Sequence, residues 1–144
     1  MKSTFLRSAL TAFTCAGAMA IATPSMAAMV NFKADLSAAT EVPPNDSKAT
    51  GAVTATYDTV TKMLSWKGSY KDLSGPATAA HFHGPAEPGK NAGVAIPITP
   101  NTSPLEGSAT LTAEQESDLM GGKWYVNVHT ATNKGGEIRG QLVK

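Results

Sequence analysis

Apolar and polar positions alternate in short runs along most of the chain, which is typical of half-buried β-strands. Segments rich in glycine, proline, asparagine and aspartate separate these runs, and such residues favour turns. The pattern predicts eight strands, at residues 30–38, 50–57, 63–72, 77–83, 93–98, 106–112, 124–130 and 136–143.

A single short helix is predicted between the sixth and seventh strands. Thr112, with Gln115 three positions later, is typical of a helix N-terminus, and the helix should run to Met120 and end at Gly121. Many short strands at this spacing predict an all-β fold, a Greek-key antiparallel β-sandwich with one short helix.

Alternation also assigns side chains to the two faces of each strand, because successive residues of a strand point to opposite sides. In the strands at 63–72, 124–130 and 136–143, the face predicted for the core carries Leu64, Trp66, Tyr70, Trp124, Val126, Val128, Ile138 and Leu142. The opposite face of the last two strands carries Tyr125, Asn127, His129, Glu137, Arg139 and Gln141.

The first 28 residues have the three zones of a secretory signal peptide. Lys2 and Arg7 give a positive start, residues 9–22 carry no charge, and small residues around Ala27 suit a signal peptidase. We expect a signal peptide over residues 1–27, a single domain over 28–144, and a periplasmic or secreted location. The uncharged stretch is shorter than the ~20 apolar residues that span a bilayer, so no membrane insertion is expected after cleavage.

Charge and cysteine content narrow the classes of partner. The chain has 12 Lys+Arg and 11 Asp+Glu, and removal of Lys2 and Arg7 with the leader leaves ten basic against eleven acidic residues. Such a balance does not favour binding to nucleic acid. The one cysteine, Cys15, lies in the leader, so the domain is expected to depend on its core without a disulfide.

The histidines carry the most specific chemical pattern in the chain. His81 and His83 share one face of a predicted strand with Cβ atoms ~6.5–7 Å apart, close enough for both imidazoles to meet one ion. His129, also outward on its strand, completes a three-imidazole site if the two strands are neighbours. Imidazole binds copper, nickel and zinc, and copper(II) binds most tightly in the divalent series, so copper is the expected ion and zinc the second choice.

Several segments together resemble the chordin-type (CHRD) domain family and follow its order. They are Glu41-Val42-Pro43-Pro44, Thr50-Gly51-Ala52, Ala77 to Pro85, Tyr125 to Thr130, and Gly135 to Leu142. The resemblance implies an immunoglobulin-like β-sandwich in a secreted or exported protein. It implies no agreed biochemical activity.

The chain is more distantly similar to Cu/Zn superoxide dismutase, which also has a His-x-His strand, a later ligand histidine and a glycine-rich turn leading to an arginine. The similarity implies copper ligands at His81, His83 and His129 and an anion-guiding role for Arg139. The chain departs from that family in having no bridging histidine, no set of zinc ligands and no cysteine for the disulfide. A two-metal site is therefore not expected.

These patterns favour a metal-binding module that holds one ion through His81, His83 and His129. Asn127, Glu137 and Arg139 are the candidates to orient the imidazoles from behind. Two alternatives remain open. One is a structural or protein-interaction module without metal, whose protein partner the sequence does not name. The other is a copper-only dismutase, although an enzyme is the less favoured interpretation.

Overall fold

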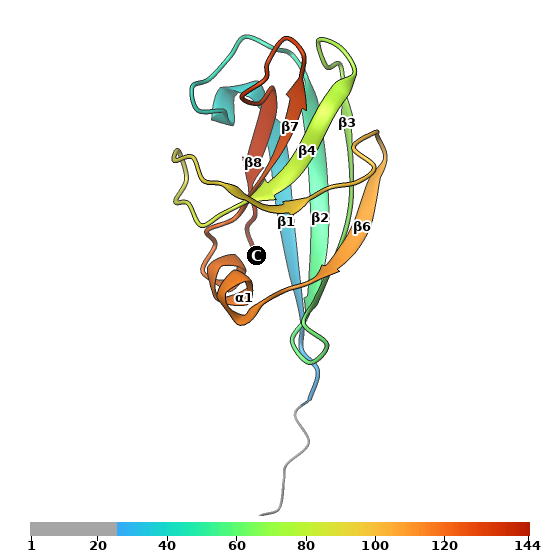
Figure 1. The fold of residues 1–144 in the computed structure, drawn as a ribbon, viewed down its shortest axis with the longest axis vertical. Helices are drawn as coiled ribbons and strands as arrows, with labels where there is room; N and C mark the ends of the chain where they lie inside the picture. Colours follow the sequence, from blue (N-terminus) through green and yellow to red (C-terminus); the bar gives the residue numbers. More distant parts are fainter. Residues whose placement is uncertain (1–25) are drawn as a thin grey trace, which may run out of the picture.

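The computed structural model describes residues 26–144 (Figure 1). The predicted signal peptide falls outside the described residues except for Met26 and Ala27, and it stays a prediction. Within the described range, no helix has the length and hydropathy that crossing a bilayer requires.

All eight predicted strands and the predicted helix are present, with ends that differ by a few residues. In chain order the elements are β1 (Met29–Ser37), the 3-10 turn η1 (Ala38–Thr40), β2 (Thr50–Asp58), β3 (Met63–Lys71), β4 (Ala77–His83), β5 (Val94–Pro97), β6 (Leu105–Thr110), α1 (Ala113–Met120), β7 (Tyr125–Thr130) and β8 (Ile138–Gln141). The turn η1 was not predicted. The last strand is shorter than the predicted 136–143, and Val143 forms only an isolated bridge to Lys33.

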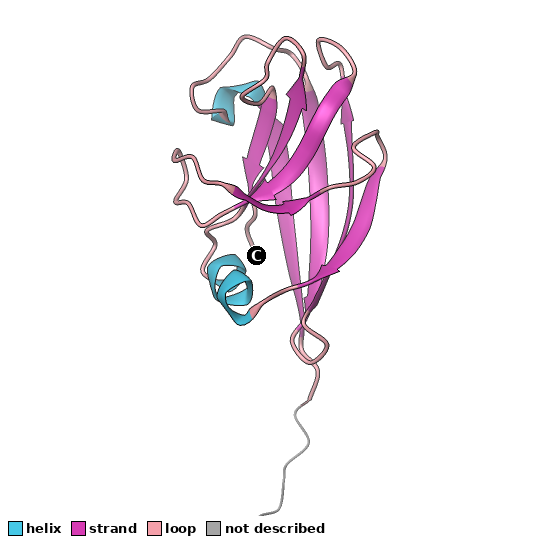
Figure 2. Ribbon diagram, viewed as in Figure 1, coloured by secondary structure: helices cyan, strands magenta, loops and turns pink. Residues whose placement is uncertain are grey.

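The strands form one antiparallel sheet in the order β5-β4-β7-β8-β1-β2-β3-β6. This sheet divides into two halves, β5-β4-β7-β8 and β1-β2-β3-β6, because β1 and β8 are paired only at Ser37 and Arg139. The two halves lie one in front of the other (Figure 2) and share one hydrophobic core. The predicted all-β fold is confirmed, as a β-sandwich whose two sheets meet along one edge.

Both halves contribute aromatic rings to this core. Trp66 of β3 packs edge-on against Phe82 of β4 at 5.0 Å between ring centroids, and Phe82 lies 6.0 Å from Trp124, which precedes β7. All predicted inward residues are buried except Tyr70, which is partly buried. Phe82 thus anchors in the core the segment of β4 that carries His81 and His83, the residues directly before and after it.

Helix α1 begins and ends as its sequence predicts. The Thr112 hydroxyl accepts a hydrogen bond from the Gln115 backbone N–H at 3.2 Å, and the Gln115 side chain accepts one from the Thr112 N–H at 3.0 Å. Gln115 also donates from Nε2 to the Ala95 carbonyl at 3.2 Å. The helix is therefore attached to β5, the strand at one end of the sheet.

The outward face of β7 and β8 is covered by other parts of the chain. Tyr125, Asn127 and Arg139 point away from the core, as alternation predicts, yet each is at most 3% exposed. Two long connections cover them, residues 38–47 and residues 84–93, which contact this face through Glu41, Lys90, Asn91 and Ala92. The covered face contains the histidines.

Candidate metal centre

The three histidines come together because β4 and β7 are antiparallel neighbours. The register pairs His81 with Asn127 and His83 with Tyr125, and it places His129 diagonally across from His81. The ring centroids lie 5.0 Å apart for His81 and His129, 5.3 Å for His81 and His83, and 6.0 Å for His83 and His129. One nitrogen from each ring lies within 4.8 Å of the other two.

Backbone carbonyl oxygens orient two of the rings. Nδ1 of His83 lies 3.1 Å from the Ala92 oxygen, and Nδ1 of His129 lies 3.0 Å from the Lys134 oxygen. A carbonyl oxygen only accepts hydrogen bonds, so both Nδ1 atoms carry the proton and both Nε2 atoms keep a lone pair. Nδ1 of His81 lies 3.2 Å from Nε2 of His129 and must be the donor of that pair.

His83 has a buried nitrogen without a partner. The residue is 8% exposed, and its Nε2 is one of three buried side-chain nitrogen or oxygen atoms among the described residues that lack a hydrogen bond. A buried polar atom without a partner costs roughly 1–3 kcal/mol, so such atoms are few in folded proteins. A cation at the cluster would satisfy this lone pair.

Burial and neighbouring charges favour the neutral form of two of the imidazoles, His81 and His83. Burial lowers the pKa of His81, and the neighbouring His129 lowers it further. Burial also lowers the pKa of His83, aided by His81 and His129 and opposed by the Ala92 carbonyl. Neutral imidazole is the form that binds metal ions, so the environment favours the binding state at neutral pH.

Arg139, Tyr125 and His83 form a layered stack. The guanidinium carbon of Arg139 lies 3.4 Å from the centroid of the Tyr125 ring. The Tyr125 ring is nearly parallel to that of His83, with 4.9 Å between centroids and 4° between planes. Arg139 therefore does not touch an imidazole directly, because the Tyr125 ring lies between them.

The same stack holds the segment over His83. Arg139 donates from Nη1 to Asn91 Oδ1 at 2.9 Å and from Nη2 to the Lys90 carbonyl. The Tyr125 hydroxyl accepts from the Ala92 N–H at 3.1 Å and donates to the Ala92 carbonyl at 3.3 Å. These bonds fix residues 90–92, and with them the Ala92 carbonyl that orients His83.

Asn127 and Glu41 form a second buried pair on this face. The Asn127 amide donates to the Glu41 carboxyl and, at 3.4 Å, to the Ile138 carbonyl, and neither bond goes to an imidazole. Burial raises the pKa of Glu41 to about 7, although a backbone hydrogen bond from Val42, the charge of Arg139 and the bond to Asn127 each work to lower it. In the sequence Glu41 is the first residue of the Glu41-Val42-Pro43-Pro44 segment that resembles the CHRD family.

Glu137 binds neighbouring hydroxyl groups rather than imidazoles. Its carboxylate accepts hydrogen bonds from the Ser47 hydroxyl at 2.7 Å, the Ser74 N–H at 2.8 Å, and the hydroxyls of Ser74 and Thr130 at 2.6 Å each. Burial acts to raise its pKa, but these donors outweigh burial and lower the pKa to about 2. Glu137 is a fully buried carboxylate that connects three segments.

Sequence reasoning missed the two carbonyl groups and the role of Tyr125. Lys134 lies in the turn at residues 133–136 that the glycines predict, and Ala92 lies in the turn-rich stretch after Gly84. The only sequence signal for such carbonyls is a predicted turn close in sequence to a strand that carries a histidine. The backbone conformation that points them inward is not encoded in any residue type.

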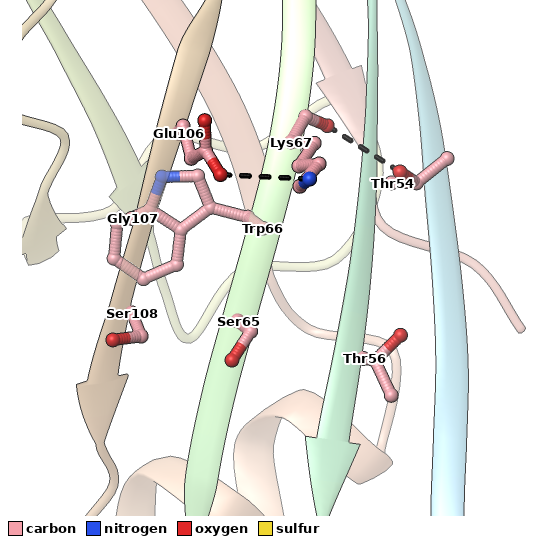
Figure 3. A pocket seen from close by; sticks show the side chains of 8 residues that line it. All are labelled: Thr54, Thr56, Ser65, Trp66, Lys67, Glu106, Gly107 and Ser108. Carbon is pink, nitrogen blue, oxygen red and sulfur yellow. Dashed lines mark hydrogen bonds and ion pairs between the residues drawn. The ribbon is translucent and has the colours of Figure 1, made fainter.

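A hollow elsewhere on the molecule offers no comparable chemistry. It lies on the outer face of β2, β3 and β6, and Figure 3 shows its lining: Thr54, Thr56, Ser65, Trp66, Lys67, Glu106, Gly107 and Ser108. Its two charged groups, Lys67 and Glu106, pair at 3.5 Å and are largely exposed. Exposed, mutually paired charges do not indicate a reactive site.

The family comparison covers the whole histidine cluster. The model of the CHRD domain matches residues 32–142, from β1 to the residue after β8. Comparison with curated proteins finds no significant match, and neither does comparison with solved structures.

Proposed function

The chain belongs to the CHRD domain family, and from that premise we propose that it binds one transition-metal ion, copper before zinc, through His81, His83 and His129. The observation that carries this proposal is Nε2 of His83, a buried nitrogen without a partner beside two other imidazoles. We further propose, on the pattern of residues 1–27, that the protein is exported to the periplasm or secreted.

The hydrogen bonds of the three rings support one donor atom for each proposed ligand. His83 and His129 offer Nε2, because their Nδ1 protons are bound by the carbonyls of Ala92 and Lys134. His81 offers Nδ1, the nitrogen directed at His129. Binding then requires the His81 proton to move from Nδ1 to Nε2, which changes the tautomer and leaves the charge of the ring unchanged.

The donor set favours copper. It consists of three imidazole nitrogens, and residues 28–144 contain no cysteine to add a thiolate. Copper(II) binds such nitrogen sites more tightly than the other divalent ions of the series, and zinc shares the preference for imidazole. Three protein ligands also leave a position for a further ligand.

Asn127, Glu137 and Arg139 act on the site through the covering segments and through the turn at residues 133–136. Arg139 and Tyr125 hold residues 90–92 over His83. Glu137 holds Thr130, whose backbone N–H and hydroxyl bond Asn133 in the turn that presents the Lys134 carbonyl to His129. Asn127 holds Glu41 of the other covering segment. Groups that fix the orientation of ligand imidazoles in this way affect metal affinity tenfold or more.

Binding is preferred over superoxide dismutation because of Arg139. An anion-guiding arginine needs a guanidinium that is open to solvent. Arg139 is 2% exposed, lies against Tyr125, and donates to Asn91 and Lys90. A structural or interaction module without metal is the interpretation that a negative binding result would favour.

Calorimetric titration of the purified protein with copper(II) tests the proposal. We expect one equivalent to bind and a rise in melting temperature, because a ligand at a hundredfold excess over its dissociation constant stabilises the folded state by ~2.7 kcal/mol. The variant His81→Ala/His83→Ala should lose both effects. Thr78→Ala, an exposed change on the same strand, should keep them. Equal binding by the parent and the double variant, or none by the parent at micromolar copper, contradicts the proposal.

A further inference from the structure

Arg139 is a buried cation without an ion-pair partner. Among the described residues its guanidinium forms no salt bridge, and its hydrogen bonds go to the neutral oxygens of Asn91 and Lys90. Glu41, a buried acid whose charge interacts with that of Arg139, has a pKa raised to about 7, so below that pH it is mostly uncharged. The positive charge of Arg139 is therefore little compensated.

This charge lies directly behind a proposed ligand. The Tyr125 ring is stacked between the guanidinium and the His83 ring, at 3.4 Å from the first and 4.9 Å from the second. All three groups are buried, so water screens their interaction weakly. Only the Tyr125 ring would separate an ion bound at His83 from the positive charge of Arg139.

We propose that Arg139 sets the preference of the site between the two oxidation states of copper, favouring copper(I) over copper(II). The inference rests on the proposed copper site and adds a role that the ligands do not have. A like charge disfavours the ion of higher charge. At an effective dielectric constant near 20, one unit charge about 10 Å away changes an equilibrium by about tenfold.

The test separates the charge of Arg139 from its hold on residues 90–92. Arg139→Met and Arg139→Gln remove the charge and keep a long, unbranched side chain. Arg139→Lys keeps the charge but loses the forked geometry of the guanidinium. Asn91→Ala keeps the arginine and removes one bond to the covering segment.

The measurements are the dissociation constants of copper(I) and copper(II), obtained with competing chelators, and the reduction potential of the copper-loaded protein. In the uncharged variants we expect affinity for copper(II) to rise about tenfold relative to copper(I). That ratio corresponds to a reduction potential lower by about 59 mV. Arg139→Lys and Asn91→Ala should weaken binding of both ions together and leave the ratio at the parent value.

Three outcomes would overturn the inference. An unchanged ratio in Arg139→Met and Arg139→Gln would show that the charge does not reach the site. An equal shift in Arg139→Lys would show that Arg139 acts through the geometry of the covering segment. A parent protein that binds no copper removes the proposed function as well, whereas a parent that binds copper with an unchanged ratio in the variants removes only this inference.

Discussion

The two half-sheets share the alternation of inward and outward side chains, but their outer faces differ in exposure to solvent. On β1-β2-β3-β6 the outward residues are polar and mostly exposed, among them Lys33, Thr54, Ser65, Lys67, Glu106 and Ser108. On β4, β7 and β8 the outward positions hold His83, Tyr125, Asn127 and Arg139, and all four are buried. The first face is solvated, and the second is covered by residues 38–47 and 84–93.

The difference shows that covering segments, and not the strands, create the chemical environment of the cluster. On the exposed face the polar groups interact with water and form weak cross-strand contacts. On the covered face most polar groups bond to protein partners. Burial lowers the pKa values of His81 and His83 and raises that of Glu41, whereas hydrogen bonds lower that of Glu137.

The largest contrast is expected between two glutamates. Glu137→Ala should lower the free energy of unfolding by about 3–5 kcal/mol, because the donors from Ser47, Ser74 and Thr130 lose their buried acceptor. Glu106→Ala on the exposed face should cost about 0.5 kcal/mol or less, because its pair with Lys67 is largely exposed. Urea unfolding of both variants measures the difference, and similar costs would remove the distinction between the faces.

The same glutamate predicts how acid destabilises the fold. The pKa of Glu137 is lowered from 4.5 to about 2, so between these values the unfolded state binds more protons and stability falls as the pH falls. The loss is on the order of 3 kcal/mol between pH 4.5 and pH 2. Glu137→Gln should lack this part of the acid dependence. An identical acid profile for parent and variant would contradict the assigned network.

Glu41 should give a smaller effect of opposite sign. Burial raises its pKa from 4.5 to about 7, so in this interval the folded state binds more protons than the unfolded state. Stability should therefore fall as the pH rises from 4.5 to 7. Glu41→Gln should remove that fall and stabilise the protein at pH 8 by on the order of 2 kcal/mol. Urea unfolding between pH 5 and 8 measures it, and a variant equally destabilised at every pH would show that the raised pKa is wrong.

The smallest effect is expected at a threonine pair matched for chemistry. Thr56 donates to Asn31 at 2.8 Å on the uncovered face, and Thr56→Ala should change the free energy of unfolding by about 0.5 kcal/mol or less. Thr130, fully buried, donates to Glu137, and Thr130→Ala should cost about 1–3 kcal/mol. A cost at Thr56 that equals the cost at Thr130 would show that burial does not change the energetic value of such a hydrogen bond.

Strand positions and facing could be predicted from the sequence because both depend on local alternation. Trp124, Val126 and Val128 are buried in one core, as their spacing indicates. The convergence of His129 on His81 and His83 needed one further fact, that β7 is the neighbour of β4. Strand order is a tertiary property, and alternation within one strand does not contain it.

The covering of the outer face could not be predicted. Alternation tells which way Tyr125 and Arg139 point, but burial depends on where residues 84–93 fold back. The sequence predicts that Asn127, Glu137 and Arg139 orient the imidazoles, and it gives no sign of the Ala92 and Lys134 carbonyls that bond the rings of His83 and His129. A carbonyl exists at every residue, so composition gives no signal for it.

The two ends of the sheet have a consequence for self-association. A free strand edge is a template on which another chain can add, and this is a route to aggregation. One end is β5, a strand of four residues that ends at Pro97 and whose Ala95 carbonyl is already bound by Gln115 of the helix. The other end is β6, which carries the charged Glu106. A neighbouring molecule therefore meets one short, partly occupied edge at β5 and one charged edge at β6. Neither edge favours the addition of another strand, so the fold is protected from edge-to-edge aggregation.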